Sequence, residues 1–152
     1  MKSIVLDQVR AVLRSRFAVL SKAAIEAHGA ATDPGSRAEG KYDTRSLEAS
    51  YLATGQARVV EELAESIRIF DALNLPDFPS HEPVGAGAMV EVEYEDGPAC
   101  YLLVPAAGGL VLTLDGFEVT LLTPTSRLYQ ELLGRREGDT LGDSSAWISS
   151  VS

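Results

Sequence analysis

The spacing of apolar residues predicts a long helix at the start of the chain. Between residues 4 and 28, apolar side chains recur at intervals of three and four with charged residues between them, which is typical of an amphipathic helix. Gly29 favours the end of this helix, and Pro34 and Gly35 oppose an immediate restart. The apolar positions of the run are Val5, Val9, Val12, Leu13, Phe17, Leu20, Ala24 and Ile25.

A second run of the same spacing predicts a second helix of similar length. It begins near Asp43 or Thr44 and ends at Asn74 and Pro76. At 1.5 Å of rise per residue, each helix would be roughly 40 Å long, and equal lengths favour an antiparallel hairpin with a coiled-coil seam. The positions that form the stripe are Ala49, Leu52, Gln56, Val59, Leu63, Ile67, Phe70 and Leu73.

Beyond a proline-rich stretch, the period changes from helical to alternating. Residues 89–95 alternate between apolar and acidic side chains up to an expected Asp96-Gly97 turn, and three further short apolar strands and a final strand around Trp147 follow. Ser126 would begin a short helix that Gly134 ends, with Leu128, Leu132 and Leu133 facing inward. The predicted fold is α+β, with a helical hairpin (1–75), a linker (76–84) and a small antiparallel β domain (85–152).

Composition and charge narrow the function. The chain has 152 residues, 45% of them apolar, and one cysteine, Cys100, so we expect a globular cytoplasmic protein with no disulfide, no membrane span and no zinc-ligand set. The net charge of -9 opposes independent binding to nucleic acid. Residues 1–78 hold 10 basic and 11 acidic residues, whereas residues 79–152 hold 3 and 11, which indicates two modules with different surfaces.

Two stretches resemble the GreA/GreB family of bacterial transcription elongation factors. The stretch "LLTPTSRLYQELLGRREGDTL", residues 121–141 and here called the signature segment, is similar to the C-terminal signature of that family. The stretch "KYDTRSLEASYLATGQARVVEELAESI" resembles the second arm of the family's coiled coil. The matching positions, which the resemblance makes candidate partner-binding residues, are Thr123, Pro124, Ser126, Leu132, Leu133 and Gly134, followed by Gly138 and Asp139.

The resemblance implies a role at RNA polymerase. The β domain would have an FKBP-like fold and dock at the rim of the secondary channel, while the hairpin enters the channel. Acidic residues at the hairpin end, Asp43 and Glu48, would then assist a Mg²⁺ ion of the polymerase active site that hydrolyses backtracked RNA, with Asp43 as the metal-facing group. The chain would bind no cofactor alone and would not itself be the enzyme.

The acids at the hairpin end can be aligned with the family's acidic positions in two ways. When "EASY" (residues 48–51) is set against the family's Asn-Ala-acid-Tyr, the two acidic positions fall on Thr44 and Leu47, whereas a shifted reading places Asp43 near the first and Glu48 near the second. Asp43 is also placed to cap the second helix. Asp33 and Glu39 are expected to be loop acids.

Two other functions stay open. One is a polymerase-binding regulator that lacks cleavage stimulation and competes with cleavage factors. The other is a prolyl isomerase, which would need an apolar, aromatic-lined pocket in the β domain. The aromatic residues available to it are Tyr94, Tyr101, Phe117, Tyr129 and Trp147.

Overall fold

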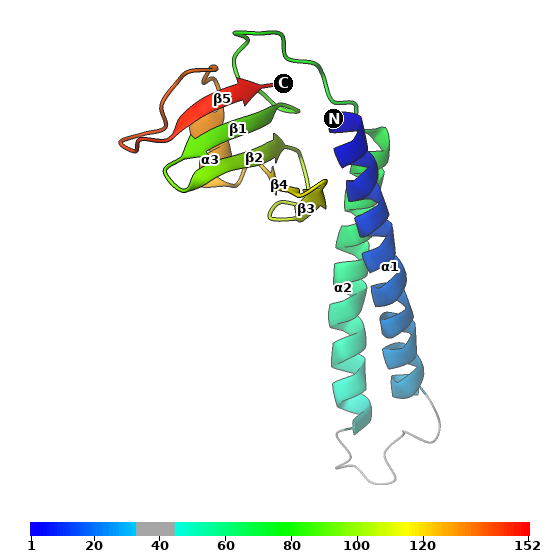
Figure 1. Cartoon of the computed structure of the whole chain (residues 1–152). Coiled ribbons are helices and arrows are strands. Elements are labelled where there is room, and N and C mark those ends of the chain that lie inside the picture. The colour runs from blue at the N-terminus through cyan, green and yellow to red at the C-terminus, as the bar shows by residue number, and fades with distance from the viewer. Residues whose placement is uncertain (33–44) are drawn as a thin grey trace. The chain divides into compact units, whose positions relative to one another are not determined.

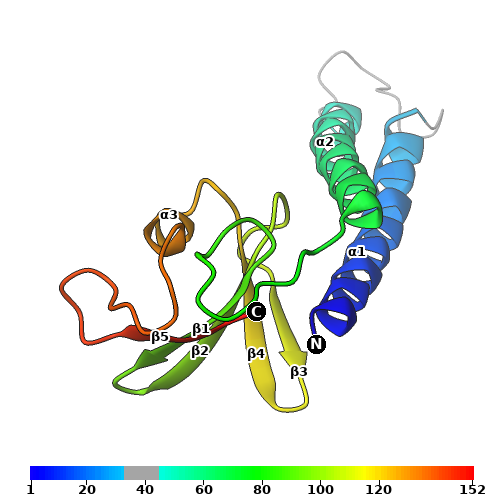
Figure 2. The same cartoon turned by 90° about the horizontal axis from the view of Figure 1, so that it is seen from above.

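The structure is a computed structural model that describes residues 1–32 and 45–152, with no side-chain description for residues 24, 27–54 and 56. Helix α1 (Lys2–Thr32) and helix α2 (Arg45–Ala72) lie side by side and run in opposite directions (Figures 1 and 2). The predicted hairpin is thereby confirmed. Over the described residues, neither helix contains an apolar stretch that could cross a bilayer.

The first helix continues beyond its predicted end. We expected it to stop at Gly29, but α1 continues to Thr32. Glycine inside a helix costs only about 1 kcal/mol relative to alanine, and Ala30 and Ala31, which follow it, are the best helix formers. The second helix ends at Ala72, before Asn74 and Pro76, as predicted.

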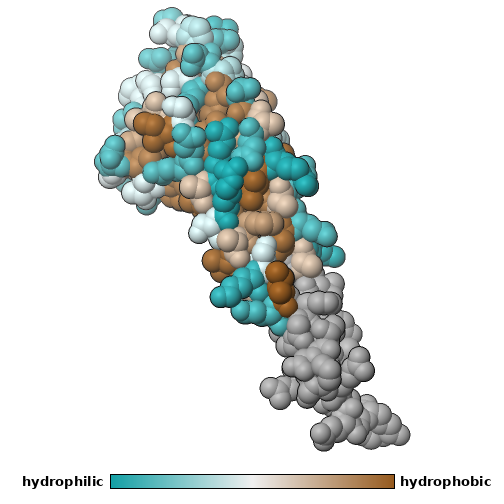
Figure 3. All heavy atoms as spheres, turned by 90° about the vertical axis from the view of Figure 1, so that its right-hand side faces the viewer, coloured by the Kyte–Doolittle hydropathy of each residue, from teal (hydrophilic) through white to brown (hydrophobic). Residues whose placement is uncertain are grey.

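Burial along the hairpin follows the predicted stripe in part. Val5, Val9 and Leu13 of α1 are buried, and so is Phe70 of α2. Ile25 and Val59, both assigned to the stripe, are instead 71% and 42% exposed. In the sequence, Ala24 precedes Ile25 and Val60 follows Val59. Consecutive residues are about 100° apart around the helix axis, so two neighbours cannot both face the other helix. Figure 3 shows hydrophobic residues interspersed with hydrophilic ones on this surface.

Five strands form one sheet in the β domain. Its order is β3-β4-β2-β1-β5, and every neighbouring pair is antiparallel except β2 and β4, which are parallel. The α+β fold class is confirmed, and the parallel pair is a feature that strand periodicity does not reveal. The strands are β1 (Met89–Tyr94), β2 (Gly97–Leu103), β3 (Val111–Leu114), β4 (Phe117–Leu122) and β5 (Trp147–Val151).

The two tight turns of the sheet differ from each other. We expected Asp96 and Gly97 to form the first turn, but Gly97 pairs with Tyr94, so that Glu95 and Asp96 are the turn residues. In the second turn, Asp115 and Gly116 have φ of 47° and 87°. Two positive φ values match the right-handed twist of an antiparallel hairpin, which is why Asp-Gly is favoured there.

Helix α3 (Arg127–Leu132) packs on one face of the sheet. Tyr129 and Leu132 of α3 are buried against Val90 and Val92 of β1 and Ile148 of β5. Burying such side chains is the main source of stability for a domain of this size. The core cluster to which these residues belong consists of Val84, Ala88, Val90, Val92, Leu103, Leu122, Tyr129, Leu132, Leu141, Ala146 and Ile148.

The chain divides into two compact units, one of residues 1–9 and 69–152 and the other of residues 10–68. Within the first unit, Lys2 of α1 donates hydrogen bonds from Nζ to the carbonyl oxygens of Pro76 (2.5 Å) and Gly87 (3.0 Å). Its ammonium group also lies 4.9 Å from the centre of the Phe78 ring. Burial lowers the pKa of Lys2, and Asp77 opposes this change. The domain boundaries expected at residues 75 and 85 stay a prediction.

Candidate functional site

The acids expected to assist catalysis lie at the junction of α1 and α2. Asp33, Glu39, Asp43 and Thr44 fall within residues 33–44, which are outside the described residues. Glu48 and Leu47 belong to the first turn of α2, and their side chains are likewise outside the description. The metal-facing role of Asp43 therefore stays a prediction.

The signature segment begins with a turn that prepares α3. The backbone N–H of Ser126 donates to the carbonyl oxygen of Thr123 (2.9 Å), and the hydroxyls of Thr123 and Thr125 are 3.2 Å apart. Gln130 then donates from its side-chain amide to the carbonyl oxygen of Pro124 (2.9 Å). These bonds hold Pro124 on the exposed side of the turn.

The predicted ends of the short helix are confirmed. Ser126 is the N-cap of α3, with extended backbone and a side-chain oxygen that accepts from the backbone N–H of Tyr129 (3.5 Å). Gly134 follows the helix with φ of 80°, the left-handed conformation that glycine adopts at low cost. Its backbone N–H donates to the carbonyl oxygen of Val84 (2.8 Å), so the end of α3 is attached to the end of the proline-rich stretch.

Two neighbouring leucines of the signature segment have opposite roles. Leu132 is fully buried in the core, whereas Leu133 is 50% exposed. The prediction that both face inward is wrong for Leu133, because α3 ends at Leu132 and the backbone of Leu133 is no longer helical (φ -57°, ψ 127°). Of the six candidate partner-binding residues, Pro124, Leu133 and Gly134 are exposed, while Leu132 supports the core.

Sequence reasoning missed a basic cluster around α3. Arg127, Arg135 and Arg136 are exposed, and they are all the lysine and arginine residues between positions 79 and 152. Arg127 Nε lies 3.2 Å from Glu131 Oε1, and Arg136 Nη1 donates to the carbonyl oxygen of His81 (2.8 Å). The uneven charge of the two halves shows that basic residues are rare between residues 79 and 152. It does not by itself indicate that the three arginines of this half lie close to Leu133 in the sequence.

Three of the five aromatic residues of the β domain belong to one place: Tyr129 is part of the core, and Tyr94 and Tyr101 pack against it. Tyr129 is buried in the core beneath α3, and Trp147 is 44% exposed on β5. The hydroxyls of Tyr94 and Tyr101 are 3.1 Å apart, and burial together with this hydrogen bond raises the pKa of Tyr101. Tyr101 and Phe117 both line a cavity of the β domain, and the prolyl isomerase alternative stays a prediction. No group of three or more histidine, cysteine, aspartate or glutamate side chains within the described ranges could hold a metal ion.

Comparison with known proteins finds similarity to solved structures alone. No protein-family model and no curated protein matches the chain. It is similar to GreA factor homolog 1 (Gfh1) of Thermus thermophilus, with 22% identity over 97% of this chain and 92% of that chain, at a TM-score of 0.37. Another structure of the transcription factor Gfh1 gives 22% identity over 96% and 90%, at 0.38.

A third similar structure is Gfh1 of Thermus aquaticus, with 19% identity over 98% of this chain and 92% of that chain, at a TM-score of 0.38. Similarity of this size does not establish membership of a family. The fold rests on the helices and strands described above.

Proposed function

We propose that the chain is an accessory factor that binds RNA polymerase through its secondary channel and modulates transcript elongation. The observation that carries the proposal is the order of parts: a long two-helix hairpin with acids at its turn, then a small β domain that contains the signature segment. Both parts are those that the GreA/GreB resemblance implies.

The length of the hairpin supports this role. Helix α1 has 31 residues and α2 has 28, which correspond to roughly 46 and 42 Å at 1.5 Å per residue. A narrow rod of this length can carry a carboxylate into a channel that would exclude a compact domain. Because Mg²⁺ prefers oxygen ligands, carboxylates at the end of the rod are suited to a cation held by the partner.

Binding is tested by a pull-down of core RNA polymerase with the full chain at micromolar concentration and low salt. We expect association, and its absence under these conditions would reject the proposal. Leu133→Ala should weaken the association about fivefold, as truncation of an exposed apolar contact does at an interface. The matched control is Val111→Ala, which also truncates an exposed apolar side chain (48% exposed) but lies on β3, outside the signature segment, and should leave the affinity unchanged.

Cleavage is tested on a backtracked elongation complex. We expect the wild-type chain to stimulate cleavage of the transcript, and Asp43→Ala with Glu48→Ala to abolish the stimulation while the association persists. The control double variant is Glu61→Ala with Glu62→Ala, which removes the same charge from exposed positions in the middle of α2. Equal loss of cleavage in the two double variants would reject the assignment of the acids.

A second candidate is a polymerase-binding regulator without cleavage activity. The presence of Thr44 and Leu47 at the positions where the direct register places the acids favours it. Such a protein would leave a backtracked transcript intact and would reduce the cleavage that a separate cleavage factor stimulates, with more inhibition as its concentration rises. Prolyl isomerase activity is the third candidate, and a short proline-containing peptide is its direct substrate test.

A further inference from the structure

The sheet has a second face, opposite α3, and this face contains a cavity. Side chains alternate along a strand, so Met89 and Glu91 of β1 point away from the core that Val90 and Val92 enter. Cys100 of β2 pairs with Glu91 and shares its face. The cavity has a volume of about 730 Å³, which lies within the range of sites for small molecules.

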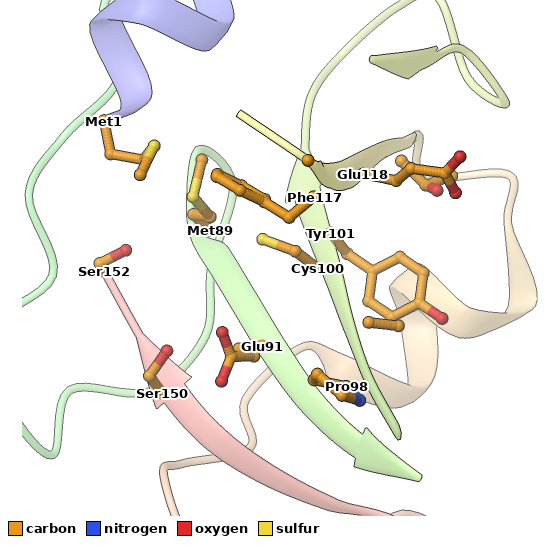
Figure 4. Close-up of a pocket in the computed structure, with 13 residues that line it drawn as sticks. Met1, Met89, Glu91, Pro98, Cys100, Tyr101, Phe117, Glu118, Ser150 and Ser152 are labelled. Carbon is orange, nitrogen blue, oxygen red and sulfur yellow. The ribbon is translucent and has the colours of Figure 1, made fainter. Parts of the chain in front are cut away.

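One side of the cavity is apolar and polarisable. Figure 4 shows Met1, Met89, Cys100 and Phe117 grouped around the same space. Both methionines and the single cysteine of the chain therefore line this cavity, together with an aromatic ring. Methionine adapts to irregular ligands, and sulfur makes favourable contacts with aromatic rings, so this side suits a flat apolar group.

The other side carries a carboxylate among hydroxyl groups. Glu91 and Ser150 lie together there, as Figure 4 shows. Glu91 Oε1 accepts a hydrogen bond from the Ser149 hydroxyl (2.9 Å), and within the described ranges the structure shows no donor to Oε2. No lysine, arginine or histidine belongs to the lining residues, which also include Glu118. The charged side chains that line the cavity, Glu91 and Glu118, are thus both negative, and the positive group among the lining residues is the α-ammonium of Met1. The Glu91 carboxylate is suited to pair with a cation.

The thiol in the cavity is not suited to covalent chemistry. Burial, and secondarily the nearby Glu91 carboxylate, raise the pKa of Cys100 from 9.0 to about 11. At neutral pH the side chain is a neutral thiol, which is a poor nucleophile and behaves as a small apolar surface. Reversible binding is therefore the chemistry that this cavity supports.

We propose that the cavity binds an organic cation with a flat apolar body, with the body against Met89, Cys100 and Phe117 and the amine beside Glu91. This site is separate from the signature segment and from the hairpin end. Its existence does not depend on polymerase binding, and its test requires only the full chain.

Three probes of the same shape separate the apolar and the electrostatic contributions. They are 2-naphthylmethylamine, 2-naphthylmethanol and 2-naphthoate, which are cationic, neutral and anionic near neutral pH. In isothermal titration calorimetry with the full chain, the amine should bind about fivefold or more tightly than the alcohol, because it adds a partly exposed charge pair, and the carboxylate should bind most weakly. Added salt should reduce the preference for the amine.

Two variants test the assigned residues. Glu91→Gln keeps the size of the side chain and should reduce the affinity for the amine to that for the alcohol, whereas Glu93→Gln, on the same strand but not lining the cavity, should not. Phe117→Ala should weaken the binding of the amine and the alcohol alike. Circular dichroism verifies that each variant is folded.

Three results would overturn the proposal. They are no saturable binding of the amine up to millimolar concentration, equal affinity for the amine and the carboxylate, and an amine preference that persists in folded Glu91→Gln. A folded Phe117→Ala variant with unchanged affinity would equally reject the assigned position of the apolar body.

Discussion

The hairpin and the β domain bury their side chains to very different degrees. Between residues 10 and 68, Leu13 is the only described side chain that is buried. In the β domain, fully buried residues come from several strands and from α3, among them Leu102, Leu121, Leu132 and Ile148. Among the described residues of the hairpin, apolar burial is thus confined to the first half of α1 and the end of α2, whereas the β domain has a closed core.

This difference in burial follows from the shapes of the two regions. Each of two paired helices covers only one side of the other, so α1 and α2 retain exposed apolar residues such as Val19, Ile25 and Val59. The β domain encloses its core because its strands bring distant parts of the chain together. We therefore expect the two regions to respond independently to mutation, and the predictions below test this expectation.

The largest effect is expected from the two adjacent leucines of the signature segment. Leu132→Ala removes a fully buried side chain and should lower the free energy of unfolding of the β domain by about 3 kcal/mol. Leu133→Ala, one residue further on and 50% exposed, should change it by less than about 0.5 kcal/mol.

Urea denaturation checks this pair of variants. The fluorescence of Trp147, the single tryptophan, reports on the β domain, and far-UV circular dichroism reports chiefly on the hairpin. In Leu132→Ala, the fluorescence transition should move to lower urea while most of the helical signal persists. If both signals move together, the two regions unfold as one unit and the comparison is wrong.

Cys100 offers a second probe confined to the β domain. Because burial raises its pKa to about 11, against 9.0 for the ordinary thiol, the thiolate fraction near about pH 8 is roughly a hundredfold lower in the folded protein than in the unfolded chain. Alkylation by iodoacetamide, followed by mass spectrometry, should be slower in the native protein by at least this factor.

The raised pKa of Cys100 also determines how the stability of the β domain changes with pH. The unfolded thiol releases its proton as pH rises through 9.0 and the folded thiol only near about 11, so the stability of the β domain should fall across that interval. Cys100→Ser, whose hydroxyl does not titrate there, should lose this part of the pH dependence. Native alkylation as rapid as in urea would contradict the burial of Cys100 and its raised pKa.

Much of the fold follows from the sequence because periodicity is a local signal. The stepped apolar residues around Leu13 and Phe70 identify both helices, and the alternation at 89–95 identifies β1. Ser126 and Gly134 identify the ends of α3 because capping depends on a few neighbouring atoms. These are features in which each residue's neighbours along the chain determine its conformation.

Other features depend on contacts that the pattern does not contain. The alternation of apolar residues is the same in parallel and antiparallel strands, so it does not indicate that β2 pairs with β4 in parallel. The exposure of Leu133 depends on α3 ending at Leu132 and not one residue later. The cavity beside Glu91 and Cys100 arises only when four strands (β1, β2, β4 and β5) and Met1 are brought together. Sequence reasoning could name the residue types at these positions but not their common location.

The smallest expected effect compares a glycine from each region. Gly55 lies within α2 and Gly134 follows α3 with φ of 80°, and a methyl group added at either position would meet no atom within 4 Å. Both positions therefore have room for a methyl group, and they differ in the backbone conformation of the glycine. Gly55→Ala should raise the free energy of unfolding of the hairpin by about 0.5–1 kcal/mol, because alanine is the better helix former.

Gly134→Ala should instead lower the stability of the β domain by about 1 kcal/mol, because an L-residue in the left-handed conformation brings its Cβ too close to the backbone. Thermal unfolding followed by circular dichroism for Gly55 and by Trp147 fluorescence for Gly134 measures the two signs. If both variants change the stability in the same direction, this explanation is wrong. It holds that helix propensity determines the effect at Gly55, whereas the left-handed backbone determines the effect at Gly134.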